Sequence, residues 1–267
     1  MENHEFQKSR TPDKESMMTN NLHSPLNLNP AEKGTEKVEI DVSVVLPCLN
    51  EELTIGKCIT DTKTVFEHLK IRGEIIVSDS SNDSSPLIAE SLGAKVVHPS
   101  KKGYGSAYIT GIEKAQGKII AMADADGTYN LKEISRFIKI LRDGDADIVI
   151  GSRLKGKIYP GAMPRLHRYI GNPLLTLIAN ILFGTRISDM HCGMRAITRE
   201  AWLKIKPKSM GMEFASEMLI KAAKKGLKIV EIPITYHPRK GSPSKLNPLK
   251  DGTRHLKLII KSRFTKK

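Results

Sequence analysis

Two aspartates separated by one residue, Asp124 and Asp126, follow a short apolar run in the sequence Asp-Ala-Asp-Gly. Two carboxylates spaced in this way at the end of a strand can have different ligands. One can reach a ribose or a water, while the other binds a hard cation between two phosphates. The small residues Ala125 and Gly127 leave room for a diphosphate. An acidic structural turn has the same pattern, so only the place of the pair after a strand favours a site.

Three further segments place polar groups where predicted strands end: residues 47–52 (PCLNEE), 79–84 (DSSNDS) and 101–105 (KKGYG). The first can hold a base and a ribose through hydrogen bonds, or it can cap a helix with Asn50. The second offers acceptors to nucleobase N–H groups, although Asx turns account for such a run equally well. The third can neutralise phosphate through lysine and backbone N–H groups, but it lacks the sequence of a P-loop.

The elements that must position these segments alternate along the chain. Apolar, β-branched runs predict strands at residues 42–46, 74–77, 95–97, 119–123, 147–150 and 229–232. Helical spacing predicts helices at residues 53–70, 86–92, 105–115, 131–141 and 213–225, a buried or interfacial helix at 173–183, and a basic C-terminal helix. This alternation predicts an α/β fold with a mostly parallel, doubly wound sheet, in which ligands bind beyond the carboxyl ends of the strands.

The composition bounds the class of protein. With 267 residues, of which 39% are hydrophobic, the chain can bury the core of one large domain or of two closely packed halves. Residues 1–37 contain few large apolar side chains and predict a disordered tail. Three widely spaced cysteines without a CxxC pair predict reduced thiols rather than a disulfide framework. No apolar run reaches the length of about 18 residues that a membrane-spanning helix needs.

Positive charge is concentrated in the second half of the chain. From Arg195 onward there are 19 Lys and Arg residues against 5 Asp and Glu, a net charge of +14 that equals the formal charge of the whole chain. Such a basic half indicates an anionic partner: phosphates, nucleic acid or an acidic membrane face. Aromatic residues make up only 5% of the chain, and the absence of a known nucleic-acid motif counts against a nucleic-acid-binding protein.

Together the four polar segments resemble the nucleotide-sugar half of the family-2 glycosyltransferases with the GT-A fold. Residues 151–153 (GSR) follow the fifth predicted strand, and residues 189–195 (DMHCGMR) look like the acceptor-side D-x-x-C-G-x-R of that family. Residues 239–245 (RKGSPSK) are similar to the R-x-x-G-x-S-K segment of dolichyl-phosphate mannose and glucose synthases in their arginine, glycine and terminal Ser-Lys. The resemblance covers about residues 41–250. It implies one GT-A catalytic domain at 38–267, with a donor half at 38–152 and an acceptor half at 153–267.

The resemblance also implies roles for individual residues. Donor contacts are expected from Pro47, Leu49, Asn50, Glu51, Asp79, Lys102, Asp124, Ala125 and Asp126. Mg²⁺ or Mn²⁺ would bind to Asp126 as the main ligand, and to Asp124. Catalytic roles are expected for Asp126, Asp189, Arg153 and Arg195, and acceptor binding for Arg239, Ser244 and Lys245.

The expected reaction is inverting transfer of a hexose from a nucleotide-sugar to a polyprenyl or dolichyl phosphate. A phosphate acceptor is already an anion, so the reaction does not need a strong base to activate it. It needs a cation and arginines that stabilise the negative charges of acceptor and diphosphate. His167, His191, His237 and His255 are candidate bases, but a structural or surface role is expected for each of them. The helical pair Glu213 and Glu217 can face the cleft or form ion pairs.

The identity of the substrates is less constrained than the reaction. Mannose synthases of the family commonly continue D-A-D with Leu-Gln, whereas Gly127-Thr128-Tyr129 follows here, which favours UDP-glucose over GDP-mannose. Transfer to a soluble or glycan acceptor remains an alternative. A nucleotidyltransferase is a further rival, but residues 46–52 lack its glycine-rich signature.

Members of the resembled family often end in membrane helices, which are not found in this sequence. Peripheral binding at the cytoplasmic membrane face is expected instead, with residues 173–183 and 249–264 either inserted shallowly or packed in the core. Assembly into a homo-oligomer is left open.

Overall fold

A computed structural model describes residues 39–265, so the tail predicted at residues 1–37 lies outside the described residues. The strands are β1 (Val42–Cys48), β2 (Gly73–Asp79), β3 (Lys95–Val97), β4 (Ile119–Met122), β5 (Ile148–Ile158), β6 (Arg195–Thr198) and β7 (Ile229–Tyr236). The helices are α1 (Ile55–Leu69), α2 (Ser85–Ser91), α3 (Tyr104–Lys114), α4 (Ile134–Arg142), α5 (Asn172–Phe183), α6 (Arg199–Ile205), α7 (Phe214–Lys224) and α8 (Pro248–Phe264). A short 3₁₀ turn, η1 (Leu131–Glu133), precedes α4, and a π-helical turn, η2 (His167–Gly171), precedes α5.

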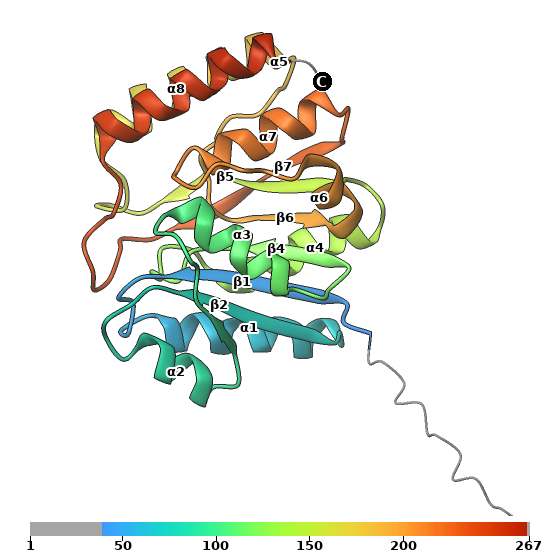
Figure 1. Ribbon diagram of the computed structural model, residues 1–267, viewed down its shortest axis with the longest axis vertical. Helices are drawn as coiled ribbons and strands as arrows, with labels where there is room; N and C mark the ends of the chain where they lie inside the picture. The colour runs from blue at the N-terminus through green and yellow to red at the C-terminus, as the bar shows by residue number, and fades with distance from the viewer. Residues whose placement is uncertain (1–38, 266–267) are drawn as a thin grey trace, which may run out of the picture. The chain divides into compact units, whose positions relative to one another are not determined.

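The strands form one seven-stranded sheet in the order β3-β2-β1-β4-β6-β5-β7 (Figure 1). All neighbouring pairs are parallel except those of β6, which runs antiparallel to both β4 and β5. The predicted mostly parallel sheet is therefore confirmed. Between β1 and β4 the strand order reverses direction, and the loops that leave these two strands diverge. In open α/β sheets this point is where ligands bind.

Two apolar layers, one on each face of the sheet, hold the helices in place. In β1, Val44 and Leu46 face the layer that includes α1 and α4, whereas Val45 faces the layer that includes α3, α6 and α7. This alternation follows from the period of two in a strand, and it explains why each strand of the centre reads as a continuous apolar run. Helices α5 and α8 contact each other and α7, and they contribute Ala179 and Ile259 to this second layer.

The second half of the chain differs most from the predicted elements. The strand predicted at residues 147–150 continues to Ile158, and β6 and α6 were not predicted. Strand β6 has four residues and begins with Arg195, so its apolar pattern is too short to recognise. Pairing with β4 and β5 on both sides supplies the burial that makes it a strand. Within residues 39–265, no helix combines the length and hydrophobicity that crossing a membrane requires.

Candidate functional site

Asp124 lies directly after β4, where aromatic residues surround its half-buried side chain. The hydroxyls of Tyr104 and Tyr108 donate to Asp124 Oδ1 at 3.0 and 3.3 Å. Burial raises the pKa of Asp124 to about 6, and the neighbouring Asp126 adds to the rise while the two hydroxyls oppose it. A Cβ atom added to Gly193 would stand 2.7 Å from Asp124 Oδ2, so the backbone of the 189–195 segment closes directly over this carboxylate.

Asp126 is buried, and its two oxygens have different partners. Oδ1 accepts from the backbone N–H and the hydroxyl of Thr128 at 3.0 and 2.6 Å. Oδ2 accepts from Arg239 Nη1 at 2.5 Å. The turn between these residues needs a left-handed backbone at Gly127 (φ +71°), which glycine adopts without strain. The local turn thus fixes Oδ1 and directs Oδ2 towards the second half of the chain.

Glu51 is the third carboxylate of the cluster and follows β1. Its Oε1 accepts from Arg239 Nη2 and, at 2.9 Å, from the Ser242 hydroxyl. Its Oε2 is buried without a hydrogen-bond partner among the described residues. Burial raises the pKa of Glu51, and Arg239 and the Ser242 hydroxyl offset part of that rise. One guanidinium therefore joins carboxylates that follow two neighbouring strands.

Asn50 links the loops that follow β1 and β2. Its backbone (φ +57°) is left-handed, its N–H donates to the Ser81 hydroxyl at 2.7 Å, and its side-chain oxygen accepts from the Asn82 N–H at 2.8 Å. Asp79 accepts from the same Ser81 hydroxyl at 2.6 Å. The N-cap of α1 is Thr54, so the alternative interpretation of Asn50 as that cap is wrong. The polar run after β2 does form the Asx turn that was the rival to base recognition.

The other predicted donor residues are Pro47, Leu49, Lys102 and Ala125. Pro47 is in β1 beside Ser78 of β2, and the Ala125 carbonyl accepts from the Thr54 hydroxyl at 2.7 Å. Leu49 is 40% exposed, and Lys102 is exposed in the loop before α3.

Arg153 and Asp189 form a buried ion pair in the acceptor half. The carboxylate accepts from Nε and Nη2 at 2.7 Å each and from the Arg153 backbone N–H at 3.1 Å. Burial alone would lower the pKa of the guanidinium, but the charge and hydrogen bond of Asp189, together with Tyr129 and Cys192, raise it above its ordinary value. The Arg153 guanidinium also lies 5.2 Å from the centre of the Tyr236 ring. This pair fixes the start of the 189–195 segment to β5.

Arg195 is buried and donates to backbone carbonyls from all three of its side-chain nitrogens. The acceptors are the carbonyls of Met190, Cys192 and Ala215, at 2.6 to 3.1 Å. Arg195 therefore closes the 189–195 turn and joins it to α7. The catalytic roles expected for Arg153 and Arg195 stay predictions.

Three tyrosines of the site were not predicted. Tyr104 and Tyr108 bind Asp124, and the Tyr129 hydroxyl accepts from the Gly193 N–H at 2.8 Å. The sequence contained a signal for Tyr104 and Tyr108. They are four residues apart in the helix that begins at the lysine loop, so they lie on the same face of it. The remaining acceptor residues, Ser244 and Lys245, are exposed beyond Arg239.

His191, His255 and Glu217 contact other side chains or the backbone, whereas Glu213 Oε2 is buried without a hydrogen-bond partner among the described residues. His255 Nδ1 and the Ser216 hydroxyl lie 2.7 Å apart, and burial lowers the pKa of His255 to about 4. His191 packs edge-on against His255. Glu217 accepts from the backbone N–H groups of residues 208 and 209 and pairs with Lys221. These contacts agree with the structural role expected for His191 and His255.

The carboxylate cluster fits a cation that binds together with a diphosphate. Among residues 39–265, no group of three His, Cys, Asp or Glu side chains forms a complete metal site. Mg²⁺ and Mn²⁺ at nucleotide sites need only one or two carboxylates, because phosphates and waters supply the other oxygens. Asp124 and Asp126 can provide these, and the unpartnered Glu51 oxygen leaves negative charge beside them.

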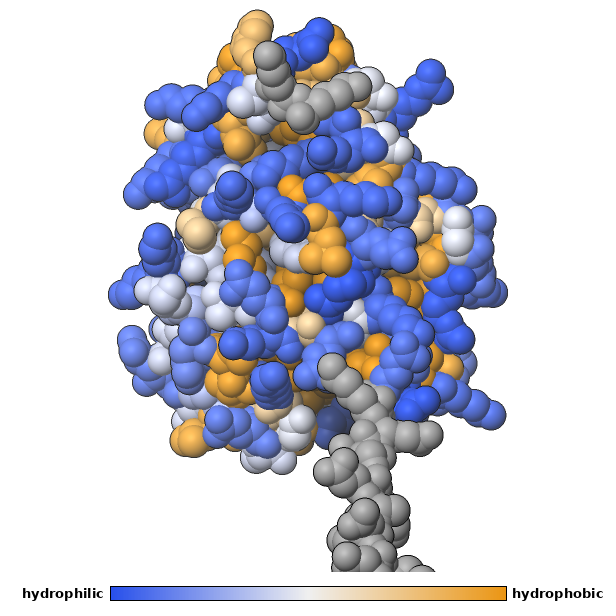
Figure 2. Space-filling view, turned by 45° about the vertical axis from the view of Figure 1, so that its right-hand side comes forward, coloured by the Kyte–Doolittle hydropathy of each residue, from blue (hydrophilic) through white to orange (hydrophobic). Residues whose placement is uncertain are grey.

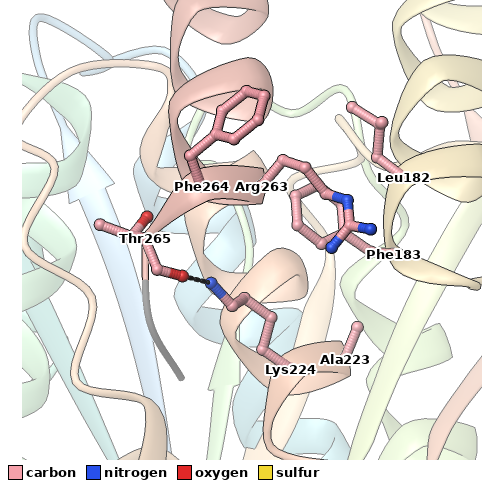
Figure 3. Close-up of a pocket in the computed structure, with 7 residues that line it drawn as sticks. All are labelled: Leu182, Phe183, Ala223, Lys224, Arg263, Phe264 and Thr265. Atoms are coloured by element: carbon pink, nitrogen blue, oxygen red, sulfur yellow. Dashed lines mark hydrogen bonds between the residues drawn. The ribbon is translucent and has the colours of Figure 1, made fainter.

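A surface cavity of about 500 Å³ lies elsewhere, between the ends of α5, α7 and α8 (Figure 3). Its lining residues are Leu182, Phe183, Ala223, Lys224, Arg263, Phe264 and Thr265. Lys224 Nζ donates to the carbonyls of Ser262 and Thr265 at 2.8 and 2.6 Å, so this lysine caps the end of α8. The cavity contains no carboxylate and is separate from the candidate site.

Comparison with known proteins relates the chain to a family. Residues 43–205 match the sequence model of glycosyl transferase family 2. The low-salt glycan biosynthesis hexosyltransferase Agl6 of Haloferax volcanii is 48% identical over 219 residues, which are 82% of this chain and 53% of Agl6. The chain thus spans about half the length of that relative. A dolichyl-phosphate hexose transferase of the same organism is 34% identical over 229 residues, which are 85% of this chain and 96% of that protein.

The fold is also found in solved structures. Glucosyl-3-phosphoglycerate synthase from Mycobacterium tuberculosis, in complex with Mn²⁺, UDP and glucosyl-3-phosphoglycerate, superposes with a TM-score of 0.66 at 24% identity. The match covers 84% of this chain and 80% of that chain. This likeness confirms the predicted GT-A fold.

Proposed function

The chain belongs to glycosyl transferase family 2, and from this premise we propose that it transfers a hexose from a nucleotide-sugar to a polyprenyl or dolichyl phosphate. The observation that carries the proposal is the cluster of Glu51, Asp124 and Asp126 at the sheet edge, joined to Arg239 of the 239–245 loop. A diphosphate site and a phosphate-binding loop are thereby in contact. The names of the Haloferax relatives, a hexosyltransferase and a dolichyl-phosphate hexose transferase, support this choice.

The donor we propose is UDP-glucose, bound by residues 38–152, with the acceptor bound by residues 153–267. The complexes of the structural relative with UDP support a uridine nucleotide, and Gly127-Thr128-Tyr129 after the second aspartate argues against mannose. Asp126, with Asp124, would hold Mg²⁺ or Mn²⁺. When bound, the cation neutralises the charge that develops on the departing diphosphate.

In the proposed mechanism, the protein positions two anionic groups close together without a strong base. An acceptor phosphate is ionised at neutral pH, and attack from the face opposite the leaving group inverts the anomeric carbon. Arg239 and Lys245 would hold the acceptor phosphate, and the ion pair of Arg153 with Asp189 keeps the facing segment rigid. Pre-placed positive groups reduce the repulsion between acceptor and diphosphate, which is the main barrier the protein can lower.

Charge removal in the 239–245 loop should affect the acceptor more than the donor. Lys245→Gln is expected to raise the acceptor KM about tenfold, as for loss of one hydrogen bond to a charged group, and the donor KM less than twofold. Steady-state kinetics with each substrate varied in turn measure both values. Lys139→Gln, which removes the same charge from an exposed position in α4, is the matched control. An equal rise in both KM values would show that the loop serves the donor or the fold.

A hydrophobic surface on α5 and α8 supports binding at a membrane. In α5, Thr176 and Ala179 are buried, whereas Leu174, Leu177 and Ile181 are 53–73% exposed. Helix α8 exposes Leu249, Ile260 and Phe264 beside basic residues. At the top of Figure 2, where α5 and α8 lie in Figure 1, hydrophobic side chains stand among hydrophilic ones. We propose that this surface inserts shallowly at the cytoplasmic face, where nucleotide-sugars are found.

Membrane binding should depend on salt and on the exposed apolar side chains. The protein is expected to sediment with anionic vesicles at low salt and to be released at high salt, because each basic residue near the surface contributes about 1 kcal/mol. Ile181→Glu should weaken sedimentation, whereas Leu87→Glu, at an exposed leucine of α2, should not. Protein that stays in the supernatant with anionic vesicles at every salt concentration would favour a soluble acceptor.

A further inference from the structure

The loop that would bind the acceptor is attached to the carboxylates that would bind the donor. Arg239 donates to Asp126 Oδ2 and to Glu51 Oε1, although these residues are 113 and 188 positions away in the sequence. The guanidinium is only 24% exposed, so the two ion pairs are partly withdrawn from water. Partly buried, hydrogen-bonded charges of this kind interact more strongly than pairs on the open surface.

The attachment includes the turn that follows Arg239. Arg239 Nε donates to the Ser242 carbonyl at 2.7 Å, and the Ser242 hydroxyl donates to Glu51 Oε1 at 2.9 Å. Gly241 has a left-handed backbone (φ +89°), and a Cβ added there would stand 3.4 Å from Leu53. Residues 239–242 are therefore joined to one another and to Glu51 by hydrogen bonds, so release of Arg239 from the carboxylates would free this turn.

Arg239 occupies the oxygen that a cation would need. Asp126 Oδ1 already accepts two hydrogen bonds from Thr128, so Oδ2 is the oxygen available to a metal ion, and Arg239 Nη1 lies 2.5 Å from it. A divalent cation at Oδ2 would repel the guanidinium at this distance. The cation and Arg239 would therefore exclude each other.

From this geometry we infer that Arg239 is an internal competitor of the divalent cation and acts as a latch on the 239–245 loop. The inference rests on the proposed function and adds an order of binding to it. With a divalent cation held by Asp126, Arg239 would be free to bind the acceptor phosphate together with the exposed Lys245. Because coupling between two sites is reciprocal, release of the loop should also increase the affinity of the carboxylates for the cation.

The test is calorimetric titration of the full chain with Mn²⁺ alone. Arg239→Gln should bind Mn²⁺ about tenfold more tightly than wild type, as for loss of a competitor held by one charged hydrogen bond. Lys240→Gln, which removes the same charge from an exposed neighbouring position, should change the affinity less than twofold. Ser242→Ala, which weakens the latch without a change in charge, should tighten binding about twofold to threefold.

Hydrogen exchange provides a second measurement on the unmodified protein. Mn²⁺ should accelerate exchange of the amides at residues 239–246 and leave those of β1 and β4 protected. Equal Mn²⁺ affinity in wild type and Arg239→Gln, or loop exchange that Mn²⁺ does not change, would overturn the inference, as would Mn²⁺ that binds neither protein. Neither readout needs a sugar or a lipid. An affinity difference that persists while transfer to lipid phosphates fails would support the latch and count against the proposed function alone.

Discussion

Asp126→Asn is expected to reduce the rate of hexose transfer by about a thousandfold or more, since loss of metal stabilisation at a leaving group costs several kcal/mol and each 1.36 kcal/mol is a factor of ten. Asparagine keeps the shape of the side chain and can still accept from Thr128 through its oxygen. It loses the negative charge at Oδ2, which is where Arg239 and a cation would bind. Single-turnover rates with saturating donor and Mn²⁺ measure the effect on the chemical step.

The burial of Asp126 makes a control for correct folding necessary. A strand-end carboxylate is expected at the surface, but Asp126 is only 6% exposed and belongs to a hydrogen-bonded cluster. Circular dichroism and thermal unfolding must therefore accompany the kinetics. Asp145→Asn, at an exposed aspartate after α4, is the matched control and should retain full activity. Near-normal transfer by folded Asp126→Asn, or transfer that survives EDTA, would contradict the metal assignment.

Asp189→Ala is expected to lower the free energy of unfolding by about 3–5 kcal/mol, because it leaves the Arg153 guanidinium buried without its partner. Asp189 is fully buried and Arg153 is 8% exposed, so solvent screens the pair very little. The loss should appear in urea unfolding as a lower midpoint with an unchanged slope. Activity should fall as well, since the pair anchors the segment that closes over Asp124.

A surface ion pair supplies the comparison for this prediction. Lys118 and Glu39 are 2.7 Å apart with side chains that are 63% and 65% exposed. Such a pair contributes about 0–1 kcal/mol, so Lys118→Ala should be nearly neutral. If Asp189→Ala were as mild as Lys118→Ala, Arg153 would have found water or another acceptor, and the rigidity assigned to this pair would be wrong.

The strongly periodic parts of the fold could be predicted from the sequence, and the parts that depend on tertiary pairing could not. Strands β1, β2 and β4 are buried on both faces, so they appear as continuous apolar runs that are bounded by polar turns. Strand β6 has no such signal, because its burial comes from neighbours that precede it in the chain. Its antiparallel direction follows from the path of the 189–195 segment across the sheet.

The candidate site was predictable to a similar extent. Carboxyl ends of parallel strands meet at one edge, which brings the segment of Glu51 to that of Asp126. The sequence could not pair Arg239 with both carboxylates, because the contact joins loops from opposite ends of the domain. Arg153 and Arg195 are buried, and they bind Asp189 and backbone carbonyls. The net charge of the second half could not predict this, because it does not show which arginines are buried.

We propose that the carboxylate cluster and the 239–245 loop serve transfer of a hexose to a lipid phosphate. The most direct measurement incubates the purified protein and Mn²⁺ or Mg²⁺ with radiolabelled nucleotide-sugars and with polyprenyl or dolichyl phosphate, and then extracts the lipid. We expect labelled lipid with UDP-glucose, formed only when the cation is present and lost when EDTA is added. Labelled lipid that forms equally well with EDTA, or donor consumption with only water-soluble products across the whole panel, would contradict the proposal.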